Sequence, residues 1–152
     1  MISVLMALAV MLTQAQEVKV PLRFDYYYSY EKVNEALKAL NTAYPEFTKL
    51  EEVGRSEEGR AIMALTINNP KTGEPFSKPG VYVDGNIHGN EIQAGEVCLY
   101  LANRLLTNYG KFAEITDVVD RNVLYIIPVV NVDGRAHFFA DANPPSSNRG
   151  LR

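Results

Sequence analysis

The chain has 152 residues, of which 47% are hydrophobic and 22% are charged, and its formal net charge at pH 7 is -3. These values are typical of a globular protein with one hydrophobic core, and they exclude a disordered chain. Because the net charge is slightly negative and the sequence has no basic stripe, a nucleic-acid-binding surface is disfavoured as well.

The N-terminal segment is predicted to be an export signal. Residues 2–12 form a nearly unbroken apolar run that is too short to span a bilayer as a helix. Thr13 and Ala15 are small residues suited to cleavage after Ala15, and polar residues follow abruptly. The alternative is a buried strand or helix, because no Lys or Arg precedes the run. A signal peptide over residues 1–15 predicts a secreted or periplasmic mature protein without a membrane span.

The mature chain is predicted to begin with a helix that a hairpin follows. Ser29 is the expected N-cap, and Pro45 marks the end, because the residue before a proline avoids the helical region. Two predicted strands, 48–54 and 61–68, flank a polar segment with one glycine, as in a β-hairpin. The helix is predicted from a single apolar stripe that consists of Tyr30, Val33, Leu37, Leu40 and Tyr44.

One histidine and one carboxylate lie three positions apart at the next strand-to-helix corner. An apolar strand, 81–83, precedes His88 and Glu91, and an amphipathic helix of about residues 90–108 follows. Neutral imidazole nitrogen and carboxylate oxygen are ligand types of Zn²⁺. At i and i+3 across such a corner, both side chains can turn toward one point outside the sheet edge. The alternative is a capping histidine beside a solvated first-turn glutamate, and the motif alone leaves both open.

The helix after Glu91 is predicted to bury an apolar stripe and to end near Gly110, in the position where glycine commonly closes a helix. Cys98 is the only cysteine, so an intrachain disulfide is excluded. It lies on the stripe and is therefore predicted to be a core residue and not a nucleophile. The predicted stripe consists of Ala94, Cys98, Leu101 and Leu105, with Val97 beside it.

A strongly apolar strand is predicted over residues 121–131, after a short helix. An unbroken apolar run suits a central strand covered on both faces, and Pro128 should interrupt its pairing on one side. The segment 131–134 is a turn by composition. Strands alternating with helices indicate an α/β protein, and the early hairpin indicates a mixed β-sheet flanked by helices. His88 and Asn131 both follow the carboxyl ends of strands, where ligands collect in such sheets.

Three blocks of the sequence stand in a distinctive order. They are Gly54-Arg55-Ser56-Glu57-Glu58-Gly59-Arg60-Ala61-Ile62, then Asp84-Gly85-Asn86-Ile87-His88-Gly89-Asn90-Glu91, then Ile127-Pro128-Val129-Val130-Asn131-Val132-Asp133-Gly134. Their order and approximate spacing resemble those of the zinc carboxypeptidase family, over most of residues 30–134. The Pro- and Ser-rich stretch after the third block is most similar to the exported bacterial branch. Three ordered blocks are far more specific than one motif.

This resemblance implies roles for individual residues. His88 and Glu91 match the family's first two zinc ligands, so Zn²⁺ is the expected cofactor and the C-termini of peptides or proteins are the expected substrates. The family places an arginine after the third block to polarise the scissile carbonyl and steady the oxyanion. Arg149 is the best match, and Arg152 is the alternative. Arg149 could instead belong with Asn148 to the family's Asn-Arg pair, which grips the substrate's C-terminal carboxylate, or be a solvated loop residue.

The sequence also departs from the family's pattern. The third zinc ligand, a downstream histidine, and the later general-base glutamate have no counterpart in the 152 residues. His137 is the only other histidine; it matches no family ligand and is predicted to be structural. Residues 16–152 are therefore expected to be the N-terminal part of a zinc carboxypeptidase-like catalytic domain, incomplete at the C-terminal end and inactive alone.

Two other classes of protein stay open on the sequence. The chain could be a non-catalytic, carboxypeptidase-like binding module. It could instead be a zinc deacylase of the succinylglutamate-desuccinylase type, which also uses a His-x-x-Glu motif. The Gly-Arg-Ser block around Ser56 disfavours the deacylase.

Overall fold

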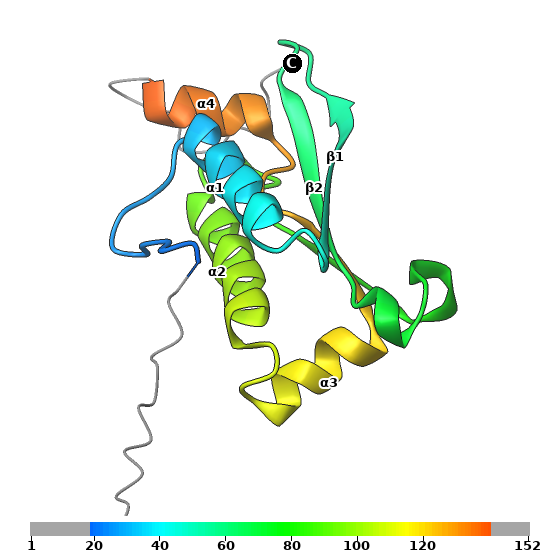
Figure 1. The fold of residues 1–152 in the computed structure, drawn as a ribbon. Helices are drawn as coiled ribbons and strands as arrows, with labels where there is room; N and C mark the ends of the chain where they lie inside the picture. The colour runs from blue at the N-terminus through cyan, green and yellow to red at the C-terminus, as the bar shows by residue number, and fades with distance from the viewer. Residues whose placement is uncertain (1–18, 141–152) are drawn as a thin grey trace, which may run out of the picture.

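The computed structural model describes residues 19–140 (Figure 1). The predicted export signal, Arg149 and Arg152 lie outside the described residues. Helices and strands alternate along the chain, which confirms the α/β prediction. The elements in order are α1 (Tyr30–Ala43), β1 (Thr48–Arg55), β2 (Ala61–Ile67), the short 3-10 helices η1 (Pro70–Thr72) and η2 (Pro75–Ser77), β3 (Gly80–Asp84), α2 (Ile92–Asn108), α3 (Ala113–Arg121), β4 (Val123–Ile127) and α4 (Val132–Ala140).

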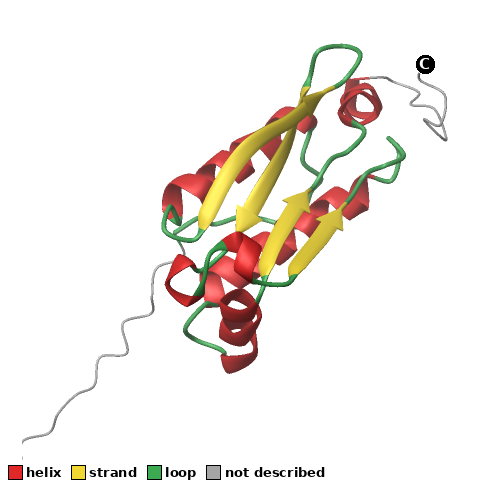
Figure 2. Cartoon of the chain, turned by 90° about the vertical axis from the view of Figure 1, so that its right-hand side faces the viewer, coloured by secondary structure: helices red, strands yellow, loops and turns green. Residues whose placement is uncertain are grey.

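The four strands form one mixed sheet in the order β1-β2-β4-β3. β1 pairs antiparallel with β2, and β2 pairs antiparallel with β4, whereas β3 and β4 run parallel. Helices α1 and α2 lie side by side on one face of the sheet, and Figure 2 shows the sheet from the opposite face. The structure therefore confirms the predicted mixed sheet and the central place of β4.

The parallel pair continues beyond its two strands. The Gly85 N–H donates to Ile127 O at 3.0 Å, and the Val130 N–H donates to Gly85 O at 3.0 Å. Asn131 N–H then donates to Asn86 O at 3.0 Å. The chain segments that follow β3 and β4 are thus held together at one sheet edge, as expected when carboxyl ends of parallel strands meet.

The hydrophobic core lies between the sheet and helices α1 and α2. The apolar stripe predicted for α1 is confirmed, and the Ser29 side chain caps this helix by accepting a hydrogen bond from Lys32 N–H. Cys98 is a buried core residue, as predicted. Burial raises the pKa of its thiol to about 11, so it carries no thiolate at neutral pH.

The predicted buried face of α2 is partly wrong. Val97 is 64% exposed, and the buried positions lie on a rotated face, because apolar residues occupy more than one side of this helix and packing selects among them. The end of the helix is as predicted: Gly110 follows the C-cap Tyr109 with a φ of 76°, in the left-handed region that glycine favours. The buried residues of α2 are Ile92, Gly95, Cys98, Leu99, Ala102, Leu105 and Leu106.

The predicted turn at residues 131–134 is also wrong, because helix α4 begins there. Asn131 Oδ1 accepts a hydrogen bond from the Gly134 N–H at 2.8 Å, and Asn131 O accepts one from the Arg135 N–H at 3.0 Å. Asparagine is favoured both in turns and at helix N-caps, so composition could not separate the two. The strand before it is shorter than predicted and ends at Ile127, directly before Pro128.

Within residues 19–140, no helix combines the length and the apolar character that crossing a bilayer requires.

Candidate metal centre

His88 and Glu91 lie in the loop between β3 and α2, at the edge of the sheet where the parallel strands end. His88 Nδ1 is 3.0 Å from Glu91 Oε2. The two side chains are 33% and 58% exposed, so both are accessible from solvent. Glu91 is the N-cap residue of α2, but its side chain makes no capping hydrogen bond. The structure thus places the two predicted ligands beside each other, with the glutamate turned toward the imidazole.

The donor atoms fit two positions around one zinc ion. Zinc binds imidazole nitrogen and carboxylate oxygen at about 2.0–2.2 Å, so two ligands at a tetrahedral angle lie about 3.4 Å apart. The separation of 3.0 Å between His88 Nδ1 and Glu91 Oε2 is a hydrogen-bond distance, so the two atoms would have to move apart by about 0.4 Å to bind one ion at that angle. Among residues 19–140, no group of three or more His, Cys, Asp and Glu side chains is arranged to hold a metal ion. This part of the chain therefore offers two ligands and not a complete set.

The backbone conformation of the loop is set by Asn86. Its φ of 54° lies in the left-handed region, which asparagine tolerates better than most residues, and the residue is 1% exposed. Asn86 Nδ2 donates to His88 O at 2.7 Å. The Glu91 N–H donates to the same carbonyl at 3.0 Å. These two hydrogen bonds close the turn that brings Glu91 back beside His88.

Behind this loop lies an arginine that the sequence did not single out. The side chain of Arg135, in α4, is 0% exposed. Its Nε and Nη2 donate to Tyr28 O at 3.0 and 2.6 Å, and Nη2 also donates to Glu96 Oε1 at 2.6 Å. Its Nη1 donates to Asn86 Oδ1 at 2.8 Å and to Ile92 O at 3.0 Å. Burial lowers the pKa of Arg135, and the charge of Glu96 opposes that shift.

The sequence held one signal of this buried arginine, a glycine inside α2. A Cβ on Gly95 would lie 2.6 Å from Arg135 Nη1 and 3.1 Å from Pro128 O. An isolated glycine within a helical pattern costs about 1 kcal/mol relative to alanine, so it is a position at which close packing is worth considering. Gly95 indicates that another part of the chain packs closely against α2, but the sequence does not identify that part.

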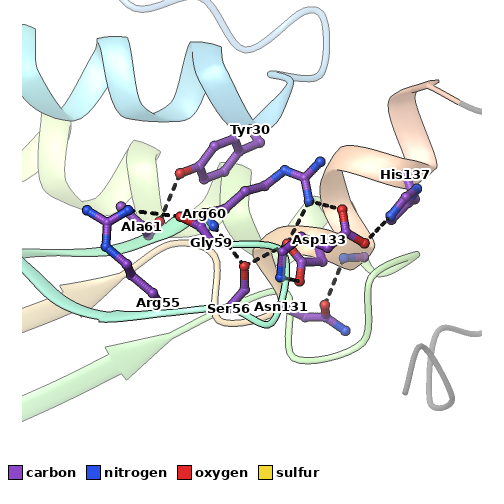
Figure 3. Close-up of polar contacts among 11 residues, drawn as sticks. Tyr30, Arg55, Ser56, Gly59, Arg60, Ala61, Asn131, Asp133 and His137 are labelled. Atoms are coloured by element: carbon purple, nitrogen blue, oxygen red, sulfur yellow. Dashed lines mark hydrogen bonds and ion pairs between the residues drawn. The ribbon is translucent and has the colours of Figure 1, made fainter.

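A second polar group, the hairpin cluster, consists of Ser56, Glu58, Arg60, Asp133 and His137. Figure 3 labels all of them except Glu58. Asp133 Oδ1 accepts hydrogen bonds from Ser56 Oγ and Arg60 Nη1, both at 2.7 Å, and Asp133 Oδ2 accepts one from the Glu58 N–H at 3.3 Å. His137 Nε2 lies 2.6 Å from Glu58 Oε1. The cluster joins the turn of the β1–β2 hairpin to helix α4.

The hairpin cluster stabilises the ionised form of its central carboxylate. Burial opposes ionisation of Asp133, but the hydrogen bonds from Arg60, Ser56 and the Glu58 N–H outweigh it and lower the pKa of Asp133. Hydrogen bonds from His137 and Arg60 likewise lower the pKa of Glu58. The first and third of the three sequence blocks therefore meet in this cluster, although more than 70 positions separate Ser56 from Asp133.

The sequence profile of the family described as zinc carboxypeptidase matches residues 33–150. The chain belongs to the zinc carboxypeptidase family. Human carboxypeptidase D is 40% identical over 110 residues, which are 72% of this chain and 8% of that protein. Carboxypeptidase B of Astacus astacus is 35% identical over 115 residues, which are 76% of this chain and 36% of that protein. The chain thus spans well under half of either relative.

Solved carboxypeptidase structures share the fold. The carboxypeptidase A from Helicoverpa armigera superposes with a TM-score of 0.69 at 29% identity, over 83% of this chain and 30% of that chain. The metallo-carboxypeptidase from Burkholderia cenocepacia gives a TM-score of 0.62 at 31% identity, over 73% of this chain and 29% of that chain. The mixed sheet with its helices is therefore part of a zinc carboxypeptidase fold, as the three sequence blocks predicted.

Proposed function

We propose that this chain supplies part of the active site of a zinc-dependent metallocarboxypeptidase, with His88 and Glu91 as two ligands of the zinc ion. The observation that carries the proposal is the 3.0 Å separation of His88 Nδ1 and Glu91 Oε2 at the edge of the sheet. The membership of the chain in a zinc carboxypeptidase family supports the choice of metal. The relatives are named carboxypeptidases, which supports peptide or protein C-termini as substrates.

The residues of this chain are proposed to bind the zinc ion and to orient the peptide substrate. A bound zinc ion would supply a water of lowered pKa and polarise the peptide carbonyl. His88 faces the glutamate with Nδ1, so a neutral ring that bound zinc through this atom would carry its proton on Nε2. Glu91 contributes a negative charge that favours a divalent cation over a neutral ligand. Arg149, with Arg152 as the alternative, is proposed to polarise the scissile carbonyl and to steady the oxyanion.

The 152-residue chain alone is proposed to hydrolyse no peptide. Two ligands hold zinc weakly, and residues 19–140 offer no group of three. We assign neither a third ligand nor a general base to this chain. Export to the periplasm or to the medium is part of the same proposal, and it is supported by the apolar run at residues 2–12.

A zinc titration of the purified chain tests the metal site. We expect the ring signals of His88 in NMR spectra to shift on addition of Zn²⁺. Isothermal titration calorimetry should show weaker Zn²⁺ binding by His88→Ala and by Glu91→Ala, with a loss at least as large as the roughly tenfold loss typical when a residue that orients a ligand is removed. His137→Ala is the matched control, since it removes the only other histidine and should leave the affinity unchanged. The site assignment is wrong if His137→Ala weakens binding while His88→Ala does not.

A peptide-release assay tests the proposed inactivity of the chain. We expect no chelator-sensitive release of C-terminal residues from peptides, with or without added Zn²⁺. Robust turnover that a chelator abolishes would show that this sequence contains a complete catalytic site. If turnover is seen, testing N-acyl amino acids in parallel separates a deacylase, which would act on them, from a carboxypeptidase.

A further inference from the structure

The side-chain amide of Asn86 bridges Arg135 and the His88 loop. Its Oδ1 accepts from Arg135 Nη1 at 2.8 Å, and its Nδ2 donates to His88 O at 2.7 Å. An amide oxygen only accepts and an amide nitrogen only donates, whereas a guanidinium only donates. Arg135 therefore fixes which end of the amide faces His88. If the amide were rotated by 180°, Asn86 Oδ1 would face His88 O, and two acceptors would repel each other.

The same arginine also holds the other end of the motif. Nη1 donates to the carbonyl of Ile92, the residue directly after Glu91, at 3.0 Å. Nη2 donates to Glu96 Oε1 at 2.6 Å, one turn further along α2. Arg135 thus contacts the chain on both sides of the segment that contains His88 and Glu91. It reaches this place because Gly95 has no side chain, since a Cβ there would lie 2.6 Å from Nη1.

We propose that Arg135 is a positioning residue for the zinc ligands, and that it acts on His88 through the amide of Asn86. The proposal rests on the proposed function, because it takes His88 and Glu91 to be the ligands. Partners that orient metal ligands from behind have large effects on metal affinity, typically tenfold to about one hundredfold. The Asn86 bridge would affect the affinity for zinc without contacting the ion. The contrasting view is that Arg135 only joins α4 to α2 and stabilises the fold.

The substitution Asn86→Asp separates the two views. Aspartate keeps an oxygen toward Arg135 and is tolerated in the left-handed region, like asparagine. It replaces the donor facing His88 O with a second oxygen, which repels that carbonyl. A role in fold stability alone predicts zinc affinity that is unchanged, or tighter because a negative charge has been added near the cation. If Arg135 positions the ligands through Asn86, Asn86→Asp should bind Zn²⁺ more weakly in spite of the added negative charge.

The experiment is a Zn²⁺ titration of the whole 152-residue chain by isothermal titration calorimetry, which reports the affinity of every variant, with near-ultraviolet circular dichroism to confirm folding. We expect Arg135→Lys and Asn86→Asp to bind Zn²⁺ about tenfold to one hundredfold more weakly than the unmodified chain. Arg121→Lys is the matched control, because Arg121 pairs with Asp117 on the surface of α3. It should bind as the unmodified chain does.

The outcomes separate failure of this inference from failure of the proposed function. If His88→Ala weakens binding while a folded Asn86→Asp variant binds with unchanged or higher affinity, Arg135 does not position the ligands. If His88→Ala and Glu91→Ala both bind Zn²⁺ like the unmodified chain, the proposed metal site itself is wrong. Should Arg135→Lys fail to fold, Asn86→Asp decides the question alone, because it keeps the acceptor that Arg135 needs.

Discussion

Arg135 shows how a charged side chain is kept in the interior of this protein. Removing a guanidinium from water is costly unless hydrogen bonds and an opposite charge replace the water. Here the carbonyls of Tyr28 and Ile92, the amide of Asn86 and the carboxylate of Glu96 take that place. Losing one partner of a buried pair costs about 3–5 kcal/mol, because it leaves the other charge uncompensated. Arg135 therefore connects four segments of the chain, which are α4, the segment at Tyr28, the loop at Asn86 and helix α2.

The fit around this arginine predicts the effect of Gly95→Ala. In an exposed helix interior, this change would stabilise the protein by about 1 kcal/mol through helix propensity. At this position the new methyl group would meet Arg135 Nη1 at 2.6 Å and Pro128 O at 3.1 Å. Moving Nη1 away would break its hydrogen bonds to Asn86 Oδ1 and Ile92 O. We expect a net loss of about 1–3 kcal/mol in the free energy of unfolding, measured by urea denaturation.

Gly54→Ala is the control for that change. Its Cβ would meet nothing closer than Ile62 Cδ1 at 3.8 Å, which is ordinary van der Waals contact. Its unfolding midpoint should stay close to that of the unmodified chain. A Gly95→Ala variant as stable as Gly54→Ala would mean that the Arg135 side chain can move away from α2 at little cost.

At the scale of elements, the start of α4 depends on one side chain. Asn131 Oδ1 accepts a hydrogen bond from the Gly134 N–H in the first turn, and the backbone N–H of Asn131 donates to Asn86 O in the loop after β3. Because Asp133 and Arg135 lie in the first turn of α4, this cap also orients the hairpin cluster and the buried arginine. A frayed first turn would loosen both.

Asn131→Ala tests the importance of the cap. We expect it to lower the free energy of unfolding by about 1 kcal/mol, since alanine offers no acceptor to the Gly134 N–H. Asn131→Asp should retain most of the stability, because its carboxylate accepts the same hydrogen bond and favours the helix N-terminus. Urea denaturation of both variants measures the difference. Equal stability of the alanine and aspartate variants would show that backbone hydrogen bonds alone define this helix start.

Local sequence rules predicted the elements more reliably than the contacts between them. The stripe of α1, the hairpin and the apolar strand β4 follow from periodicity and turn chemistry, which act over a few residues. The rotation of α2, seen in the exposed Val97, depends on what packs against the helix. Burial of Arg135 depends on partners 39 to 107 positions away in the chain, and no local pattern reports such contacts. The pairing of His88 with Glu91 was predictable because both residues lie in one short motif.

At the scale of the whole molecule, the hairpin cluster connects segments that are distant in the sequence. Ser56, Glu58 and Arg60 come from the β1–β2 turn, and Asp133 and His137 come from α4 (Figure 3). The turn of the outer hairpin is thereby fastened to the helix that also carries Arg135. Acid that protonates the carboxylates of this cluster should loosen the connection between the hairpin and α4.

The lowered pKa values of Asp133 and Glu58 give the direction of this pH dependence. A carboxylate whose pKa is lower in the folded state stabilises the fold above its unfolded pKa, and that contribution is lost as pH falls through the folded value. We therefore expect the free energy of unfolding to fall progressively as pH drops from about 5 to below 4.

Asp133→Asn removes one titrating group, so the variant should be less stable at pH 7, and its free energy of unfolding should depend less steeply on pH over this range. Asp117→Asn removes a carboxylate from a surface pair with Arg121 and should change stability by only about 0.5 kcal/mol. Urea denaturation at stepped pH values measures all three proteins. If the Asp133→Asn curve runs parallel to that of the unmodified chain, Asp133 does not link protonation to the attachment of the hairpin.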